Sequence, residues 1–403
     1  MKNKGTIYIM ALAVFLIGTI EYIITGIIEM MAADLGVSTA EAGMLVTVFA
    51  LAAAIIAPIL IASTINVDRR KLLLFTFGVF IASNGIMMLD LSYEAMIWIR
   101  IIQGASGGMT TVVSMAAATR LVENEKRGNA IGIILMGLSS SLVLGVPIGT
   151  FFSEMFGWRM LFMVIGLLSV VPFLIIYRKV PSIREQEKVT LIMQLSLLKN
   201  KSIIIALMMS LLYVGGYATL FTYITPFLQT TSSLSMTEIS LILFLAGICS
   251  FMGSKLGGQL ADARGSKFTV FLGLVLQGVT LLLFAVTGTH LILLILVLMI
   301  FMLATWSISP AQQLYLVTLA PRSPDIALSL NTSLIQFGFA LGSGLGGLVI
   351  SRSSVLSLNW AGVVAVGIAF CLAILQFKGA SKRQGVAASA QKINTQRDAA
   401  EHP

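Results

Sequence analysis

The sequence predicts an all-α membrane protein whose twelve transmembrane helices form two pseudo-symmetric six-helix bundles. Of its 403 residues, 57% are hydrophobic and only 11% are charged, whereas a soluble globular domain carries roughly 25% charged residues. Mean hydropathy is +0.97, so apolar segments dominate nearly the whole chain. These values exclude an ordinary soluble protein and make lipid the solvent to consider.

Twelve apolar segments are long enough to cross a bilayer, whose core of about 30 Å needs about 20 helical residues. The predicted spans are 7–31, 42–65, 72–90, 94–118, 129–153, 157–177, 202–229, 237–257, 268–288, 290–319, 327–350 and 355–377. The first span is longer than the apolar region of a signal peptide and is followed by the other spans. We therefore expect it to be a transmembrane helix.

The longest polar interruption divides the spans six and six. It predicts an N-terminal bundle at 1–177, a cytoplasmic linker at 178–201 and a C-terminal bundle at 202–377. The tail at 378–403 is polar and lacks Phe, Tyr and Trp, so we expect it to be disordered. A basic loop after the second span and a glycine-rich fifth span occur in both halves. Such repeats are typical of transporters that bind substrate near the midplane.

The net charge of +9 could indicate a nucleic-acid partner, but the basic residues are not spread evenly over the loops. All Lys and Arg except Arg100, Arg159 and Arg352 fall on the side of the N-terminus in the predicted topology. This positive-inside bias places both termini in the cytoplasm. It accounts for the basic charge without nucleic acid, and we expect a monomer.

Glu21 and Arg100 are charged residues within predicted spans, where a charge costs about 2.5 to 3.5 kcal/mol on insertion scales. Desolvation favours the neutral form of Glu21, and a carboxyl that faces a wet cavity can load and release a proton. The alternative is a protonated glutamate bonded to a neighbouring helix. Arg100 could bond backbone carbonyls or Gln103, or influence a protonatable partner, and the sequence leaves these open.

Aromatic and amide side chains without formal charge occur in several spans. A planar, neutral, hydrogen-bonding solute could stack on the rings and bond the amides; helix packing and interfacial aromatic belts are the alternative. With Glu21, the candidate substrate-binding residues are Tyr22, Tyr213, Tyr217, Phe221, Tyr223, Trp306, Gln312, Gln313, Asn331 and Gln336.

Catalytic constellations are missing from the sequence. The two histidines, His290 and His402, cannot form a catalytic triad or a zinc cluster within the membrane. No G-x-x-x-x-G-K-[ST] motif is present to bind ATP. We therefore expect that the protein is not an enzyme and uses no cofactor. The expected energy source is an ion gradient or the gradient of the solute itself.

Glycines at a spacing of four residues predict close helix contacts. Gly145 and Gly149 in the fifth span follow this spacing, as do Gly338 and Gly342 in the eleventh. Pro147 lies between the first two and predicts a bend in the fifth span.

The chain resembles the twelve-span drug:proton antiporters of the major facilitator superfamily, from residue 18 to about 377. Arg100-Ile101-Ile102-Gln103-Gly104 resembles the fourth-span motif, which implies a link between the arginine and proton transfer. Gly145-Val146-Pro147-Ile148-Gly149, followed by Gly157-Trp158-Arg159, resembles the fifth-span antiporter motif, which implies export. Segments 220–227, 306–313 and 329–333 and the position of Glu21 resemble bacterial purine base and nucleoside efflux pumps.

The loop after the second span departs from the family motif G-x-x-x-D-R-x-G-R-[RK]. The first half has Asp68-Arg69-Arg70-Lys71 without the leading Gly and Asp. The second half keeps Gly258, Asp262 and Arg264 but has Ala263 in place of the first arginine. The charged latch between bundles that the resemblance implies is therefore expected to be weaker, or re-formed by Asp68.

Our leading hypothesis is a proton-coupled exporter of a small planar solute, a purine base or nucleoside, that works by alternating access in a bacterial cytoplasmic membrane. Glu21 is expected to carry the proton. One alternative is a multidrug, amphenicol or sugar exporter of the same fold. Another is a membrane sensor that transports nothing.

Overall fold

All twelve predicted spans are helical in the computed structural model of the chain, which describes residues 4–64, 67–123, 127–182, 197–232, 234–287, 290–321 and 324–377. Helix α8 ends at Lys179 and α10 begins at Lys201, so the predicted linker lies between them. Residues 183–196 of that linker and the predicted disordered tail fall outside the described residues.

The first half contains α1 (Lys4–Tyr22), α2 (Ile24–Leu35), α3 (Thr39–Ser63), α4 (Arg69–Ile86), α5 (Tyr93–Arg120), α6 (Arg127–Ser140), the π-helical turn η2 (Ser141–Gly145), α7 (Val146–Phe156) and α8 (Trp158–Lys179). The second half contains α10 (Lys201–Phe221), α11 (Ile224–Ser232), α12 (Met236–Arg264), α13 (Ser266–Leu283), α14 (Leu291–Leu319), α15 (Pro324–Arg352), the 3-10 turn η3 (Val355–Ser357) and a last helix at 358–377.

Among the described residues, ten helical segments are long and apolar enough to cross a membrane. The helices α4 and α5 are not among them, since α4 begins with three basic residues and α5 is rich in Gly, Ser and Thr, which lower its hydropathy. Both pack within the first bundle, where α5 contacts α3 and α4 contacts α8. They complete the twelve spans of the predicted all-α membrane fold, which is confirmed.

The second span of each half starts with the same hydrogen-bonded cap. Ser38 accepts from the amide of Glu41, whose carboxylate accepts from the amide of Ser38 at 2.8 Å. Ser235 and Glu238 form the same reciprocal pair at the start of α12. A capping box satisfies two free amides at a helix start, and its repetition supports the internal repeat that the sequence predicts.

Two spans that the sequence predicts as continuous are interrupted. The first is broken at Ile23, between α1 and α2, and the seventh at Thr222 and Tyr223, between α10 and α11. The two breaks occupy corresponding places in the repeats, and discontinuous helices of this kind build substrate sites in many transporters. Glu21, predicted to be deep in a continuous helix, therefore lies in the last turn of α1.

The fifth span changes its helical form before Pro147. The π-turn η2 separates α6 from α7, and Pro147 lies in the first turn of α7. Proline has no amide hydrogen to donate to the preceding turn, so regular α-helical bonding is lost there. The irregularity predicted at Pro147 thus takes the form of a π-turn.

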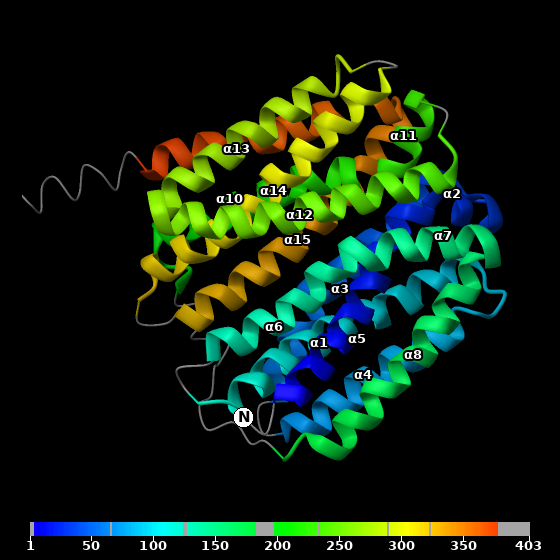
Figure 1. Cartoon of the computed structure of the whole chain (residues 1–403), viewed down its shortest axis with the longest axis vertical. Coiled ribbons are helices and arrows are strands. Elements are labelled where there is room, and N and C mark those ends of the chain that lie inside the picture. Colours follow the sequence, from blue (N-terminus) through cyan, green and yellow to red (C-terminus); the bar gives the residue numbers. More distant parts are fainter. Residues whose placement is uncertain are drawn as a thin grey trace, which may run out of the picture.

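The two bundles lie side by side in Figure 1, with α1 to α8 in blue to green and α10 to the last helix in green to red. They contact each other where α3 packs on α15 and where η2 and α7 pack on α12. Helices α5 and α3 approach closely at Gly104, since a side chain there would collide with the Phe49 carbonyl of α3. At Gly342, where the sequence predicts a close helix contact, a side chain would likewise collide with the Gly215 carbonyl of α10.

Candidate functional site

Glu21 lies at the contact between the two bundles. Its side chain is 4% exposed, and its Oε1 accepts a hydrogen bond of 3.0 Å from Nε2 of Gln336 on α15. A buried carboxylate is stable only where it is paired or hydrogen-bonded. The structure therefore places this carboxyl between the bundles, with a donor from the opposite one.

Arg100 is fully buried on α5 and is held mainly by backbone carbonyls. Its Nε donates to Leu45 O at 3.0 Å and its Nη1 to Ile20 O at 3.1 Å. Nη1 also donates to Gln103 Oε1 at 3.1 Å, and the guanidinium lies 4.3 Å from the ring centroid of Phe49. Arg100 therefore bonds both backbone carbonyls and Gln103, which is one of the two possibilities that the sequence leaves open.

Arg100 is also electrostatically coupled to Glu21. It bonds the carbonyl of Ile20, the residue before Glu21, and the opposite charges attract one another. Since that carbonyl lies at the end of α1, Arg100 also ties the interrupted helix to α5. The two readings of Arg100 are thus compatible, because the group that bonds the carbonyls also influences the carboxyl.

The network extends beyond Gln103 to a residue that the sequence analysis missed. Gln103 Nε2 donates to Asn84 Oδ1 at 3.3 Å, and Asn84 Nδ2 donates to Phe80 O at 2.7 Å on α4. Asn84 is fully buried. A buried amide in an apolar span was the signal that could have identified it.

An aromatic cluster adjoins Glu21. Tyr22 packs edge-on against Phe339 of α15 with ring centroids 5.8 Å apart. Tyr217 of α10 packs on Phe339 at 6.2 Å and stacks on Phe221 at 4.8 Å and Phe301 at 5.9 Å. Phe301 and Phe339 join the predicted residues here; single phenylalanines in apolar spans gave no signal.

Two polar atoms near these rings lack hydrogen bonds of regular geometry. Among the described residues, neither the buried Tyr217 hydroxyl nor the buried Nε1 of Trp306 has a hydrogen bond of regular geometry, and the two side chains lie close to one another. Buried polar atoms are nearly always bonded. They are therefore the atoms of this cluster best suited to bond a polar solute.

The other predicted substrate residues have surroundings of their own, and their role in binding stays a prediction. Gln312 Nε2 donates to Ala206 O of α10 at 2.6 Å, while half-buried Gln313 contacts Ser309 at 3.5 Å. Tyr213 is buried, and its carbonyl accepts from Gln277 at 3.0 Å. Asn331 is buried on α15 without a bond to its Oδ1 in the described part of the chain.

Tyr223, at the break between α10 and α11, lies in a contact between the bundles that we call the seal. Helices α2 and α11 lie at the same end of the molecule (Figure 1). Its hydroxyl donates to Ser343 O at 3.1 Å, and its ring occupies the space beside Gly43 of α3. Thr225 Oγ1 donates to Thr25 O at 2.7 Å across the same contact. The structure therefore assigns Tyr223 to this seal rather than to the Glu21 and Gln336 pair.

A cavity of about 670 Å³ lies at the outer edge of this seal. Glu29 of α2, Ser38 before α3 and Ser351 of α15 are among its lining residues. Glu29 is half-buried and follows Glu21 by two helical turns. It gives the structure a second glutamate on the same interrupted span.

The basic loop of the first half is bonded within its own bundle. Asp68 caps α4 by accepting from the amides of Arg70 at 2.8 Å and Lys71 at 3.2 Å, and it accepts from Ser182. Arg70 donates to the Tyr177 carbonyl of α8. These bonds hold α4 to the end of α8, and none of them joins the two bundles.

The remaining loop residues have different surroundings. Arg69 is buried at the start of α4. In the second half, Arg264 lies over the Phe268 ring at 5.5 Å, Asp262 is exposed, and Gly258 has open space beside its Cα.

The tryptophan and arginine after the fifth span fasten the other end of the first bundle. Trp158 Nε1 donates to Asp34 at 3.1 Å, and Arg159 pairs with Asp34 and with Asp90 at 3.0 Å. These contacts join α8 to the end of α2 and to the segment that follows α4.

Two repeated six-helix halves, each with an interrupted first span, and a buried carboxyl at their seam define a two-bundle membrane transporter. The chain belongs to the major facilitator superfamily, whose profile matches residues 10–323 and 206–397. It is a multi-pass membrane transport protein and not an enzyme.

Relatives cover nearly the whole chain. The uncharacterized MFS-type transporter YbcL of Bacillus subtilis is 35% identical over 95% of this chain and 98% of its own length. YtbD of the same species, also described as an uncharacterized MFS-type transporter, is 32% identical over 91% and 93%. The inner membrane transport protein YdhP of Escherichia coli is 27% identical over 95% and 98%.

Solved structures share the fold at low sequence identity. A bacterial homologue of the human lysosomal transporter Spinster, inward-facing and unoccupied, superposes with a TM-score of 0.74 at 16% identity, covering 93% of this chain and 96% of that one. The occupied inward-facing form gives 0.71 at 17% identity, covering 92% and 96%.

Proposed function

We propose that this transporter exports a small planar solute, a purine base or nucleoside, in exchange for protons. The observation that carries the proposal is the hydrogen bond between Glu21 and Gln336, because it links a protonatable group of one bundle to the other bundle. A change in the protonation of Glu21 therefore acts directly on the contact between the bundles.

Protonation changes the energy of this contact for electrostatic reasons. A carboxylate accepts a hydrogen bond more strongly than a neutral acid does, and only the ionised form attracts Arg100. Loss of the charge weakens these two interactions, but it also removes the larger cost of burying a charged carboxyl, so the neutral form suits the closed contact. A ligand or proton shifts a conformational equilibrium only through such a difference between states.

The direction of exchange follows from the predicted orientation. With both termini in the cytoplasm, the seal formed by Tyr223 and Thr225 is on the outer side. Protonation of Glu21 from outside favours the return to this outer-sealed arrangement, because Glu21 is buried there and burial disfavours the charged carboxyl. Solute binding then favours proton release inward. One charge crossing 100 mV supplies about 2.3 kcal/mol.

The proposed substrate class rests on the aromatic cluster and on the family resemblance. A nucleobase can stack on the rings of Tyr217 and Tyr22 and bond the Tyr217 hydroxyl and Trp306 Nε1. Sugar exporters and broad multidrug exporters share the fold, so substrate competition is the deciding experiment.

The proposal is tested in inverted membrane vesicles with an imposed pH gradient. We expect uptake of labelled hypoxanthine or adenosine that collapses with the gradient and is not displaced by sugars, amphenicols or cationic dyes. Gradient-driven uptake of those compounds instead of purines would overturn the substrate class. Absence of flux for every compound at every gradient would overturn proton-coupled export itself.

A further inference from the structure

The first bundle has a cavity of about 460 Å³ on its flank, away from the contact between the bundles. Helices α3, α4 and α5 form its walls, through Leu60, Leu72, Phe75, Ile102, Ala105 and Met109 among others. Phe75 is 70% exposed and Ile102 46%. Because these spans lie in a bilayer, the cavity opens to lipid. We call it the flank groove.

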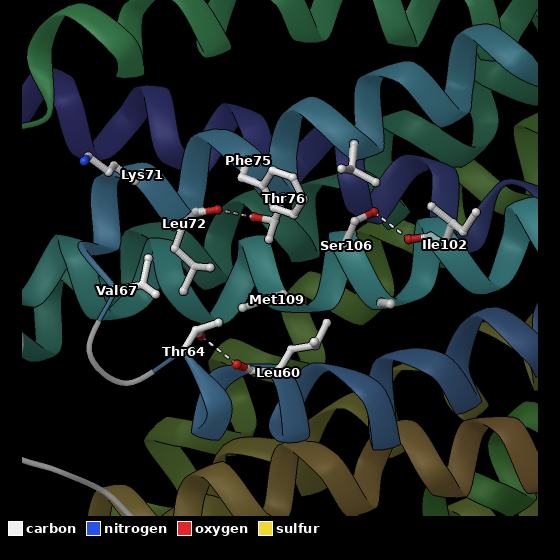
Figure 2. Close-up of a pocket in the computed structure, with 12 residues that line it drawn as sticks. Leu60, Thr64, Val67, Lys71, Leu72, Phe75, Thr76, Ile102, Ser106 and Met109 are labelled. Atoms are coloured by element: carbon white, nitrogen blue, oxygen red, sulfur yellow. Dashed lines mark hydrogen bonds between the residues drawn. The ribbon is translucent and has the colours of Figure 1, made fainter.

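The hydroxyl groups of the groove are already satisfied by their own helices (Figure 2). Thr64 donates to Leu60 O at 2.6 Å, Thr76 to Leu72 O at 3.0 Å and Ser106 to Ile102 O at 2.6 Å. A ligand therefore finds no free hydroxyl donor along the walls. The groove suits an apolar chain rather than a polar solute.

One end of the groove carries a positive charge. Lys71 lines the groove at the start of α4, and Figure 2 shows its ammonium nitrogen at one end, with Ser106 and Ile102 toward the other. Along α4, Lys71 and Val79 are about 12 Å apart at about 1.5 Å per residue. Half of a bilayer core is about 15 Å thick.

This combination of shape and charge matches one class of ligand. We propose that the flank groove is a binding site for an anionic phospholipid, with an acyl chain along α4 and α5 and the headgroup phosphate paired with Lys71. The predicted topology places Lys71 in the cytoplasmic leaflet, where anionic lipids attract basic residues. A free phosphate cannot use the apolar walls, and a zwitterionic lipid gains less from the lysine.

The proposal is tested with purified full-length protein, titrated with phosphatidylglycerol or phosphatidylcholine while the melting temperature is recorded. Native mass spectrometry counts the lipids retained. We expect phosphatidylglycerol to stabilise the protein more than phosphatidylcholine, and glycerol 3-phosphate to have no effect. Equal stabilisation by the two lipids, or an equal shift with glycerol 3-phosphate, would overturn the proposal.

Two kinds of variant distinguish the contact with the lipid headgroup from the contact with the acyl chain. Lys71→Gln should weaken phosphatidylglycerol binding about fivefold, which corresponds to about 1 kcal/mol for one basic residue near the membrane surface. Lys267→Gln is the matched control, since Lys267 follows the corresponding loop of the second bundle. A Lys71→Gln protein that binds phosphatidylglycerol as the control does would contradict the headgroup contact.

Filling the groove tests whether it holds an acyl chain. Ala105→Phe should remove the retained lipid whatever its headgroup, and Val79→Phe serves the same purpose if the first variant does not fold. Folding is checked by the melting temperature without added lipid. A folded variant of either kind that retains as much lipid as the unmodified protein would overturn the site.

Discussion

The carboxyl of Glu21 on α1 and the side-chain amide of Gln336 on α15 are joined by a hydrogen bond of 3.0 Å that crosses from one bundle to the other. The bond lies immediately before the break between α1 and α2. Arg100 bonds the carbonyl of Ile20 on the same turn. A proton-accepting group is thus placed at an interrupted helix and at the bundle contact together.

Replacement of Gln336 by Leu tests the bond from its donor side. The carboxyl of Glu21 loses its donor from α15, and an unsatisfied buried polar group costs about 1 to 3 kcal/mol. We expect a lower melting temperature and a changed pH profile of export. Gln229→Leu is the control, because the contact of Gln229 with Met236 Sδ is long at 3.5 Å; equal effects of both substitutions would argue against the bond.

Arg100→Lys keeps the positive charge but removes the planar guanidinium group. A lysine ammonium cannot reproduce the planar guanidinium that stacks on Phe49 and bonds three oxygens. We expect at least a tenfold loss of transport (about 1.4 kcal/mol) in a protein that still reaches the membrane. Normal gradient-driven flux in this variant would show that charge alone suffices.

The hydroxyl of Tyr217 distinguishes binding from packing. Tyr217→Phe removes a buried hydroxyl that has no hydrogen bond of regular geometry, so stability should change little. If that hydroxyl bonds the solute, affinity falls about threefold to tenfold, as expected for one hydrogen bond of about 1 kcal/mol. Titration with adenosine in a thermal-shift assay measures both quantities. A folded protein with unchanged affinity would leave Tyr217 as a packing residue.

Tyr223 is expected to maintain the seal. Tyr223→Ala removes the ring that fills the space beside Gly43, so Thr25 becomes accessible from the outer side. Labelling of a cysteine at position 25 by an impermeant maleimide, with Cys249 and Cys371 replaced, should increase. Tyr223→Phe retains the ring and loses only the bond to Ser343, so it should label far less. Similar labelling of both variants would mean that the ring does not close this end.

The spans and their division into two halves could be predicted because each depends on local composition. Apolar length fixes a transmembrane helix, and a charge inside a span marks Glu21 and Arg100 as candidate functional residues. The break at Thr222 is marked by Pro226, which has no amide hydrogen to donate to the Thr222 carbonyl. The break at Ile23 has no proline beside it and could not be predicted, because it depends on contacts with other helices, such as the bond from Arg100 to Ile20.

The candidate site was predictable as a set of residue types and not as an arrangement. Gln336, Tyr217 and Tyr22 meet near Glu21, whereas Gln312 bonds the backbone of α10 and Tyr223 lies in the seal. A hydropathy pattern does not state which face of a helix meets the other bundle. Phe339, which bridges Tyr22 and Tyr217, is indistinguishable in sequence from any lipid-facing phenylalanine.

The most direct measurement is of protons released when purified protein binds purine in weakly buffered solution. The unmodified protein and Glu29→Gln should both release protons on addition of adenosine, whereas Glu21→Gln should bind adenosine and release none. Proton release by Glu21→Gln equal to that of the unmodified protein would contradict the assignment of Glu21 as the coupling residue.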